Sequence, residues 1–301
     1  MSEPTRRANQ CDSSDNASTN SAATKAAVLV DALPYIRRFW GKVVVIKYGG
    51  NAVGDDSDLA RFAEDIVLMR TVGMRPVVIH GGGPQIGDLM KRLGKEPEFH
   101  DGLRVTDAET LDIARMVLVG KVNREIVAAV NVHDPLAVGL SGEDAGLITA
   151  SARSPELGFV GDVATINTTI LDRLLAQDLI PVVATIGTDE TGQAYNINAD
   201  TAAGAIAAAL KAEKLVYLTD IEGLRRDVRD PGTLIHTLTV EELEKLMADG
   251  TLEGGMIPKA ASCAQAVRAG VSRAHILDGR QAHALLLEIF TPEGVGTMVQ
   301  P

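Results

Sequence analysis

The sequence VVVIKYGG, residues 43–50, runs four branched apolar residues into a lysine and then turns on two glycines. Such a short run of valine and isoleucine predicts a buried strand of a parallel sheet. A lysine is rarely buried unless a negative group pairs with it, so Lys47 indicates a charged site at the end of this strand. PVVIHGGGPQIGDLM, residues 76–90, repeats the design with three glycines, and two such turns need a common explanation.

The rest of the chain alternates between short apolar runs and helical patterns. This alternation predicts right-handed crossovers between parallel strands, and therefore an α/β fold, a three-layer αβα sandwich with a mainly parallel central sheet. Residues 98–106 and 147–168 predict hairpins or irregular excursions instead. The predicted strands are 43–47, 76–80, 136–140, 180–184, 214–219 and 272–277, and the predicted helices are 57–72, 84–94, 107–132, 198–210, 239–248 and 257–269.

Two segments precede the first predicted strand. Residues 1–24 contain few large apolar groups and predict a disordered tail. Residues 25–41 predict a helix with a kink at Pro34. Two interpretations of this helix are open: it packs back on its own domain, or it is an oligomerisation arm, which the aromatic residues at its end favour. Its apolar stripe consists of Leu29, Leu33, Ile36 and Trp40.

The composition restricts the classes of partner and compartment. The 301 residues carry a formal net charge of −11, which argues against a nucleic-acid partner and against an anionic membrane surface. The two cysteines, Cys11 and Cys263, are too few for a disulfide framework and lack metal-ligand spacing. No apolar run reaches the length of a membrane span, and the N-terminus lacks the apolar core of a signal peptide. A cytoplasmic protein is therefore expected.

The glycine turns have the features of an anion site. Gly81–Gly83 follow the second predicted strand, and Pro84 occupies the expected first position of a helix. Bare backbone amides at a helix N-terminus bind anions, and glycine lets an anion approach closely. Gly49 and Gly50 can act in the same way after the first strand. A pair of tight turns without a ligand is the alternative.

Three familiar glycine-rich motifs fail on particular residues. A Walker loop needs Ser or Thr after Gly-Lys, and none of the three Gly-Lys pairs has one. GGGPQIG, residues 81–87, has Ile86 where a dinucleotide fingerprint needs its third glycine. The HGGG of an esterase oxyanion hole requires a GxSxG elbow, and the nearest candidate, GLSGE at 139–143, ends in Glu143.

A second lysine lies at a predicted helix start. Lys259 follows Pro258 in the first turn of an alanine-rich helix, where a cation opposes the helix dipole. An anionic ligand would resolve this conflict for Lys259 as it would for Lys47. A solvated surface lysine is the alternative.

Amides, an acid and an arginine complete the set of candidate residues. YNINAD, residues 195–200, places Asn196, Asn198 and Asp200 at alternate positions, which point the same way in an extended segment. A helix N-cap explains one of them, but the three together predict a polar cluster that binds a carboxylate and orients lysines. Arg104, in a predicted hairpin, suits a substrate carboxylate, with a surface salt bridge as the alternative.

The combined set points to one class of reaction. It contains two lysines, amide-rich glycine loops, an arginine and an acid, and neither a metal cluster nor an obvious histidine or cysteine nucleophile emerges from the sequence. Such a set suits phosphoryl transfer, in which catalysis consists mostly of positioning and charge stabilisation. An acceptor that is already ionised, such as a carboxylate, needs no general base.

The motifs KYGGNAV, HGGGPQI, GLRVT, NINAD, LTDIEG and GMIPK occur in this order, and the ordered set resembles the amino-acid kinase family over residues 26–300. The resemblance implies the amino-acid kinase fold over residues 42–301, with an N-lobe, 42–190, for the amino acid and a C-lobe, 191–301, for the nucleotide. It also implies transfer of the γ-phosphate of ATP to the side-chain carboxylate of N-acetyl-L-glutamate. This transfer forms an acyl phosphate in the second step of arginine biosynthesis. Members that act on aspartate, glutamate, carbamate or uridylate are the rivals.

The resemblance assigns roles position by position. It implies that Asp200 holds Lys47 and Lys259, which stabilise charge on the transferring phosphoryl group. Mg²⁺ would arrive with ATP and be held mainly by the phosphates, without a dedicated protein metal site. Substrate contacts are implied for Gly82, Gly83, Arg104, Asn196 and Asn198, and nucleotide contacts for Lys47, Gly49, Gly50, Thr219, Asp220, Gly223, Leu224 and Lys259.

Both ends of the chain are similar to those of arginine-inhibited members. In those members helical arms interlace dimers into a ring, so the resemblance implies a homohexamer, a trimer of dimers. The segment 274–298 resembles their arginine site, with His275, Glu288 and Gly294 at matching positions, so L-arginine is the expected feedback inhibitor. An arginine-responsive scaffolding protein without turnover is the alternative of a different class, and the intact lysine–aspartate–lysine set argues against it.

Overall fold

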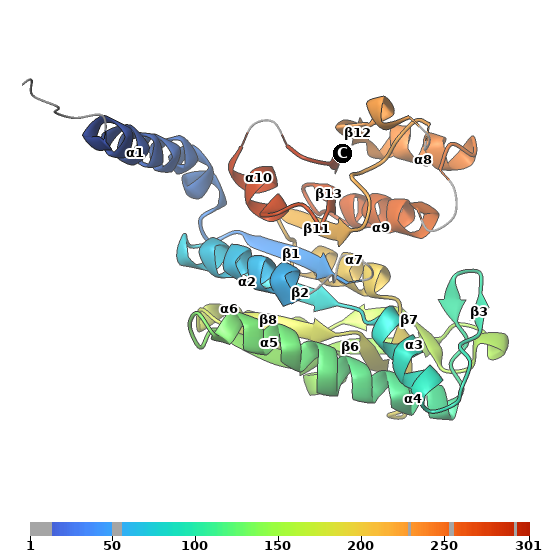
Figure 1. Cartoon of the computed structure of the whole chain (residues 1–301). Helices are drawn as coiled ribbons and strands as arrows, with labels where there is room; N and C mark the ends of the chain where they lie inside the picture. The colour runs from blue at the N-terminus through green and yellow to red at the C-terminus, as the bar shows by residue number, and fades with distance from the viewer. Residues whose placement is uncertain (1–13, 50–55, 228–229, 253–255, 292–293) are drawn as a thin grey trace, which may run out of the picture.

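Eight strands form the central sheet, in the order β12-β14-β13-β11-β1-β2-β8-β5 (Figure 1). The computed structural model describes residues 14–49, 56–227, 230–252, 256–291 and 294–301. Neighbouring strands pair in parallel except β13 and β14, which are antiparallel, so the predicted mainly parallel sheet is confirmed. The strands are β1 (Val43–Tyr48), β2 (Arg75–His80), β5 (Ala137–Ser141), β8 (Ile180–Ala184), β11 (Lys214–Thr219), β12 (Thr237–Thr239), β13 (Ala274–Asp278) and β14 (Thr297–Gln300).

Helices cover both faces of this sheet because side chains alternate across each strand. In β1, Val44 and Ile46 pack into one core, whereas Val45 packs into the other. The three-layer αβα sandwich is therefore confirmed. The first core includes residues of α2 (Asp56–Thr71), α3 (Gly83–Arg92), α4 (Ala108–Arg115), α5 (Asn123–Asn131) and α10 (Ala284–Phe290), and the second includes residues of α6 (Thr169–Ala176), α7 (Ala199–Ala209), α8 (Val240–Ala248) and α9 (Met256–Arg268).

The six predicted strands agree with β1, β2, β5, β8, β11 and β13 to within two residues at either end. Both predicted hairpins are also present, as β3 (Phe99–His100) with β4 (Leu103–Arg104), and β6 (Ile148–Ala152) with β7 (Val160–Ile166). The second hairpin joins β9 (Ile186–Thr188) and β10 (Ala194–Ile197) in a small closed barrel that the sequence did not predict. Strands of three or four residues are too short for a periodic signal.

The helix predicted over 107–132 is interrupted. A π-helical segment, η2 (Met116–Val122), separates α4 from α5. Val117, Leu118 and Val122 of η2 are buried in the same core as the adjoining helices. A π segment adds a residue to the turn and is frequent at functional sites, so this interruption marks a place for closer inspection.

The N-terminal helix α1 (Ser14–Phe39) begins eleven residues earlier than predicted, so residues 14–24 are helical rather than a disordered tail. The remainder of that tail, residues 1–13, lies outside the described residues. The helix continues through Pro34, and the kink there stays a prediction.

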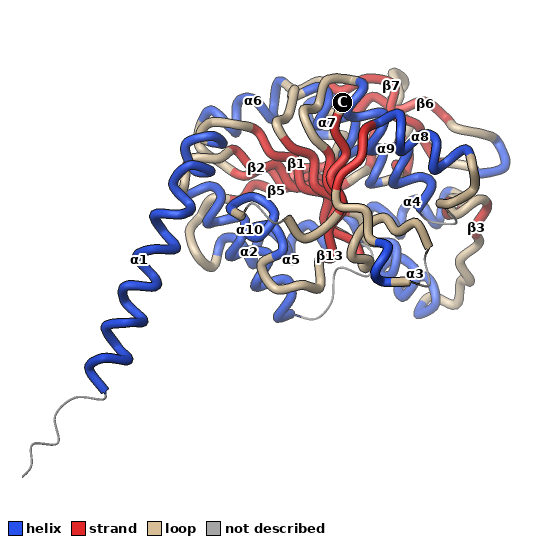
Figure 2. Tube along the Cα trace, turned by 90° about the horizontal axis from the view of Figure 1, so that it is seen from above, coloured by secondary structure: helices blue, strands red, loops and turns tan. Residues whose placement is uncertain are grey.

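Figure 2 shows α1 extending away from the rest of the chain. Its C-terminal end packs on the domain: Phe39 is buried, and α1 contacts α10. Val28, Leu29 and Val30 remain 61–71% exposed, so packing back on the domain does not explain this part of the helix. Within the described residues, no helix combines the length and the apolar character needed to cross a membrane.

Candidate active site

The carboxyl ends of β1 and β2 and the amino end of α7 meet around one cleft. Strand β1 lies between β2 and β11, and the order of strands reverses at this point, which is where α/β sheets bind ligands. The cleft has a volume of about 230 Å³. Its lining includes Lys47, Gly81, Gly82, Gly83, Arg104, Thr185, Asn196, Asn198 and Asp200.

Two lysines from distant parts of the chain share one carboxylate at this cleft. Lys47, next to the end of β1, places its Nζ 3.0 Å from Asp200 Oδ1. Lys259, in the first turn of α9, donates a hydrogen bond of 2.7 Å to Asp200 Oδ2. Lys47 and Asp200 are only 5% and 7% exposed. The structure therefore brings together the three residues that the sequence predicted to act together.

The charges of this cluster support one another. Burial by itself raises the pKa of Asp200, but the charges and hydrogen bonds of Lys47 and Lys259 outweigh it and leave the pKa below its usual value. Burial lowers the pKa of Lys47, and the carboxylate of Asp200 opposes this change. Two ammonium groups facing one ionised carboxylate leave positive charge toward the cleft, which suits a phosphoryl group.

Hydrogen bonds fix both the backbone N–H and the backbone carbonyl of Asp200. Asn198 is the N-cap of α7, and its side-chain oxygen accepts hydrogen bonds from the N–H groups of Asp200 and Thr201. The carbonyl of Asp200 accepts hydrogen bonds from Tyr217 Oη at 3.1 Å and Ser262 Oγ at 2.9 Å. These two hydroxyls come from β11 and α9, and the sequence analysis did not identify either of them.

The residues of the NINAD motif line one cleft as predicted, but their backbone conformation differs from the extended segment that the sequence predicted. Strand β10 ends at Ile197, and Asp200 lies in the first turn of α7 rather than in an extended segment. The extended segment ends here because the Asn198 side chain caps the helix. Asn196, Asn198 and Asp200 nevertheless all line the cleft. Asn196 also donates to Thr106 Oγ1 at 3.3 Å.

The glycine turns after β1 and after β2 bring their two backbone segments close together. Gly49 has φ +149°, and a Cβ on it would lie 3.1 Å from the Gly81 nitrogen, so only glycine fits both the space and the conformation. Gly82 precedes α3 as its N-cap, with Pro84 in the first turn, as predicted. Gly82 and Gly83 both line the cleft. Gly50, the remaining predicted glycine, lies outside the described residues.

Arg104 lies on the hairpin beside the cleft. It is 9% exposed, and its guanidinium donates to the Gly83 carbonyl at 2.8 Å and lies 4.7 Å from the centre of the Phe99 ring. Burial lowers its pKa from the usual value. The surface salt bridge that was the alternative for Arg104 is wrong, because the side chain is buried and turned toward the glycine turn.

The residues predicted to border the nucleotide divide into two groups. Thr219 ends β11, and its hydroxyl donates to Asp220 Oδ1 at 3.1 Å. The carboxylate of Asp220 acts on Lys47, because its charge opposes the lowering of the Lys47 pKa by burial. Thr219 and Asp220 therefore lie beside the lysine cluster.

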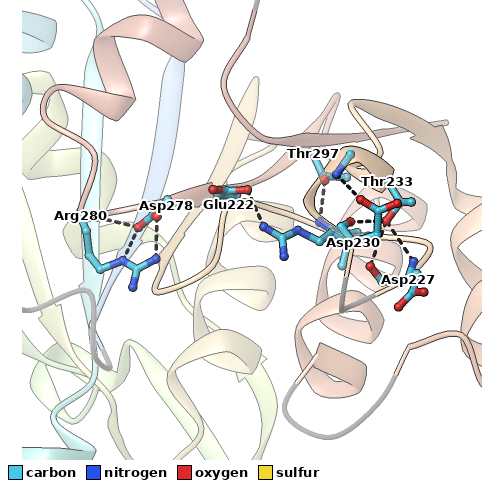
Figure 3. Close-up of polar contacts among 10 residues, drawn as sticks. Glu222, Asp227, Asp230, Thr233, Asp278, Arg280 and Thr297 are labelled. Atoms are coloured by element: carbon cyan, nitrogen blue, oxygen red, sulfur yellow. Dashed lines mark hydrogen bonds and ion pairs between the residues drawn. The ribbon is translucent and has the colours of Figure 1, made fainter.

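Gly223 and Leu224 turn instead toward the core. Thr297 Oγ1 accepts a hydrogen bond of 2.8 Å from the Leu224 N–H and donates one of 2.6 Å to the Ile235 carbonyl (Figure 3). A Cβ on Gly223, at φ +152°, would overlap the same hydroxyl. Leu224 is 1% exposed, so its side chain is not available to a ligand. A nucleotide contact from Leu224 stays a prediction that its burial does not support.

The same edge of the sheet carries several charged side chains. Arg280 is held on Asp278 by hydrogen bonds of 2.8 and 2.9 Å, and Glu222 lies nearby (Figure 3). The described residues contain no group of three or more His, Cys, Asp or Glu side chains placed to hold a metal ion.

Of the three residues predicted to bind arginine, Glu288 and Gly294 line a second pocket, and His275 is fully buried behind Glu288. His275 Nδ1 is 2.8 Å from Glu288 Oε1, and Gly294 adopts φ +61° against the same carboxylate. Burial lowers the pKa of His275 to about 4, so its ring is neutral at pH 7. Lys214 Nζ lies 3.2 Å from His275 Nε2, which accepts from the ammonium, so the proton of the neutral ring is on Nδ1, the nitrogen that faces Glu288.

This second pocket has a volume of about 290 Å³ and lies where the end of α1 meets the C-terminal segment. Glu288 contributes a negative charge, and Lys214, Arg38 and Arg273 contribute positive charges. Lys214 was not identified from the sequence, although a lysine that opens a buried apolar strand raises the same question of a partner as Lys47, which lies at the end of one. The pocket residues of α1, which are Tyr35, Arg38 and Phe39, were not identified either.

Comparisons with known proteins identify the family. A family model described as the amino acid kinase family matches residues 42–278. The chain belongs to the amino acid kinase family. It is 58% identical over 287 residues to an acetylglutamate kinase of Symbiobacterium thermophilum, covering 92% of this chain and 98% of that one. It is 53% identical to an acetylglutamate kinase of Saccharopolyspora erythraea, covering 96% of each chain. Because its sequence is 53–58% identical to these kinases over most of its length, this member of the family is a kinase.

Solved structures agree with this family. N-acetylglutamate synthase from Neisseria gonorrhoeae, complexed with coenzyme A and N-acetyl-glutamate, has a TM-score of 0.81 and 30% identity. This chain spans 63% of that synthase, with 92% of its own length covered. The same synthase complexed with coenzyme A and L-arginine has a TM-score of 0.79. A carbamate kinase of Giardia lamblia, 18% identical with a TM-score of 0.63, shows the same fold.

We expect Lys259→Ala to lower kcat at least about 100-fold, because one of the two ammonium groups that stabilise the transferring charge is removed. Asp200 keeps Lys47, so the fold and nucleotide binding should survive. Steady-state ADP formation and calorimetric titration with ATP measure the two effects. Lys245→Ala, an exposed lysine on α8, is the control. Turnover of Lys259→Ala within threefold of the parent would exclude this role.

Proposed function

We propose that this chain transfers the γ-phosphoryl group of ATP to the side-chain carboxylate of N-acetyl-L-glutamate, the second step of arginine biosynthesis. The observation that carries the proposal is the Lys47–Asp200–Lys259 cluster, whose Lys47 and Asp200 line the same cleft as Arg104. Cations face the position of a phosphoryl group, and a guanidinium suits the α-carboxylate of an amino acid. The identity to named acetylglutamate kinases over nearly their whole length supports the choice of acceptor.

The chemistry of this transfer needs positioning more than proton transfer. The acceptor carboxylate is ionised at neutral pH, so no general base has to remove a proton. Lys47 and Lys259 stabilise negative charge that spreads over the phosphoryl oxygens, and Asp200 holds the two ammonium groups in place. The N–H groups of Gly49, Gly82 and Gly83 provide further donors for phosphate and substrate oxygens.

The same proposal divides the chain between its two substrates. Residues 42–190 supply most of the amino-acid side, and residues 191–301 supply the nucleotide side through Thr219, Asp220 and the loop to Gly223. Asn196 and Asn198 belong to the second part of the chain but face the acceptor cleft, where their amides suit a carboxylate. The cleft is therefore completed by both parts.

Mg²⁺ fits this site as a companion of ATP. Of the carboxylates near the cluster, Asp200 is already paired with both lysines and Asp220 accepts from the Thr219 hydroxyl, so the phosphates are the expected main ligands. The ion supplies charge neutralisation on the β- and γ-phosphates when it is bound.

Discrimination among acceptors tests this function directly. We expect ADP formation from Mg-ATP with N-acetyl-L-glutamate, and at least about 100-fold slower formation with L-glutamate or L-aspartate. The free α-amino group of those two acids brings a positive charge close to Arg104 and the lysines, which is unfavourable. A coupled spectrophotometric assay measures the rates. Equal turnover of L-glutamate would contradict N-acetyl-L-glutamate as the acceptor. The absence of turnover with all three acids would favour a binding protein.

We also propose that the second pocket binds L-arginine and that this binding inhibits turnover. The pocket carries both signs of charge, as a zwitterion with a cationic side chain requires. Glu288 suits the guanidinium, and Lys214 and Arg273 suit the α-carboxylate. Burial raises the pKa of Glu288, but His275, the Val295 N–H and the charge of Lys214 together outweigh it and leave the pKa below its usual value, so the carboxylate stays charged. The synthase structure that contains L-arginine is compatible with such a site.

Glu288→Gln removes this charge with little change in volume. We expect the arginine concentration for half-inhibition to rise at least about tenfold, because a charge-assisted bidentate pair is lost. Glu190→Gln, an exposed residue between β9 and β10, is the matched control. Turnover without arginine is recorded for both variants, so that damage to the fold is distinguished from loss of the site. Unaltered inhibition of Glu288→Gln would contradict the assignment.

We further propose that α1 assembles dimers of this chain into a hexamer. Its exposed apolar residues, Val28, Leu29 and Val30, need cover that the domain itself does not give. Removal of residues 1–41 should therefore leave dimers, and should weaken arginine inhibition because Tyr35 and Phe39 of the second pocket are lost. Sedimentation equilibrium measures the assembly. A hexamer that survives the truncation would refute the role of α1.

A further inference from the structure

His80 ends β2 immediately before the glycine turn, and the proposed reaction assigns it no role. Its side chain is fully buried on the face of the sheet that carries α5, opposite the face to which Lys47 points. Nδ1 lies 3.0 Å from the carbonyl oxygen of Gly81, the next residue. Nε2 lies 3.0 Å from Nδ2 of Asn123, the first residue of α5.

The proton on this ring can be assigned by counting donors. Asn123 is fully buried, and its Nδ2 carries two protons. One is donated to the Val182 carbonyl at 2.9 Å, and the other lies between His80 Nε2 at 3.0 Å and the more distant Leu140 carbonyl at 3.4 Å, so the shorter contact is the one to the ring. The Oδ1 of the same amide contacts the Arg124 guanidinium, which fixes the orientation of the amide. Nε2 therefore accepts, and a neutral ring must carry its proton on Nδ1.

Burial keeps the ring neutral, since it lowers the pKa of His80 to about 4, and the charge of Arg124 acts in the same direction. The Nδ1–H consequently donates to the Gly81 carbonyl. Asn123 thus decides which nitrogen of His80 is a donor, and His80 decides where the Gly81 carbonyl points.

The direction of that carbonyl fixes the direction of the next N–H. In a trans peptide the C=O of one residue and the N–H of the following residue point in opposite directions. The Gly81 carbonyl is turned toward a buried ring, so the Gly82 N–H is turned away from it, toward the cleft that Gly81, Gly82 and Gly83 line. Within the described residues, neither the Gly82 nor the Gly83 N–H donates to a protein acceptor.

The π-helical segment η2 packs against the peptide between Gly81 and Gly82. A Cβ on Gly82 would lie 2.8 Å from Leu118 Cδ2 and 3.3 Å from Val122 Cγ2, both in η2. Asn123 follows η2 directly, so one segment supplies both the amide that orients His80 and the apolar surface against Gly82. The interruption of the helix gives these side chains their places.

We propose that His80 and Asn123 are positioning residues that aim the Gly82 N–H at the transferring phosphoryl group. Neither residue touches a substrate; they act through the peptide between Gly81 and Gly82. The proposal rests on the proposed phosphoryl transfer. A donor aimed in advance at developing charge lowers the barrier, whereas one that must reorient does so less.

Four variants test the proposal in the full-length protein. His80→Phe keeps the ring but removes the donor, and His80→Asn keeps a donor near the place of Nδ1. Asn123→Leu removes the group that selects the tautomer. Asn131→Leu, at the other end of α5, is the control, because Asn131 also makes two amide hydrogen bonds, to the Ala137 backbone, away from the cleft.

We expect kcat of His80→Phe to fall about 10- to 100-fold, with both KM values within threefold of the parent. Asn123→Leu should lose less, since the ring can still adopt the donating tautomer for part of the time. His80→Asn should recover part of the loss, and Asn131→Leu should retain the parent kcat. A kcat of His80→Phe within threefold of the parent, or an equal loss in Asn131→Leu, would overturn the proposal.

A measurement without mutation tests the geometry independently of turnover. Long-range ¹H–¹⁵N spectra of the ¹⁵N-histidine-labelled parent distinguish a protonated from an unprotonated ring nitrogen. The His80 ring, assigned from its absence in His80→Phe, should be neutral and protonated at Nδ1 between pH 6 and 8. Protonation at Nε2 would overturn the proposal even if the enzyme turns over. A parent without turnover that still shows the Nδ1–H ring would refute the proposed function while leaving the orientation of the peptide in place.

Discussion

The carboxylate of Asp200 is the contact on which this structure depends. It faces the ammonium groups of Lys47 in the central strand and of Lys259 in the first turn of α9. These two lysines are far apart in the sequence of the domain. Without Asp200, Lys47 would be a buried cation beside a second cation, an arrangement that costs several kcal/mol. Its backbone is correspondingly well fixed, with Asn198 on the N–H side and two hydroxyls on the carbonyl. Strand, helix N-terminus and second helix therefore have to meet at one point.

The polarity of the parallel sheet explains why the cleft and the second pocket are separate. Carboxyl ends of parallel strands share an edge, which collects Lys47, the glycine turns and Thr219 on one side of the molecule. Lys214 opens β11 and belongs to the second pocket, whereas Thr219 closes the same strand beside the cleft. Five residue steps separate them, about 17 Å along a strand. Any effect of an occupant of the second pocket on the cleft would therefore require displacement of the elements between them rather than direct contact.

Local sequence patterns predicted the elements that have a period, and they failed where contacts are long-range. The strands with runs of valine and isoleucine and five of the helices, α2, α3, α7, α8 and α9, were predicted to within two residues, whereas α6 and α10 were not predicted and the helix expected over 107–132 is interrupted. The small barrel was missed because β9 and β10, which pair with each other as a short hairpin, are closed into it by pairing with β6 and β7, and this pairing leaves no local pattern. Asn196, Asn198 and Asp200 line one cleft as predicted, but the Asn198 side chain caps α7 and places Asp200 in the helix rather than in an extended segment. The His80–Asn123 contact joins residues 43 positions apart, and nothing local in the sequence indicates it.

A lysine at the end of a buried strand raises the problem of how such a site exists without its ligand. Asp200 solves it, because its charge allows Lys47 to be buried in the absence of phosphate. Two ammonium groups share this one carboxylate, so the pairing satisfies the fold without cancelling the positive charge at the cleft. An acid matched to a single lysine would leave little attraction for an anion, and a site without the acid would repel its own second lysine. The ratio of two cations to one acid is therefore what allows the same cluster to be stable when empty and attractive to a phosphoryl group.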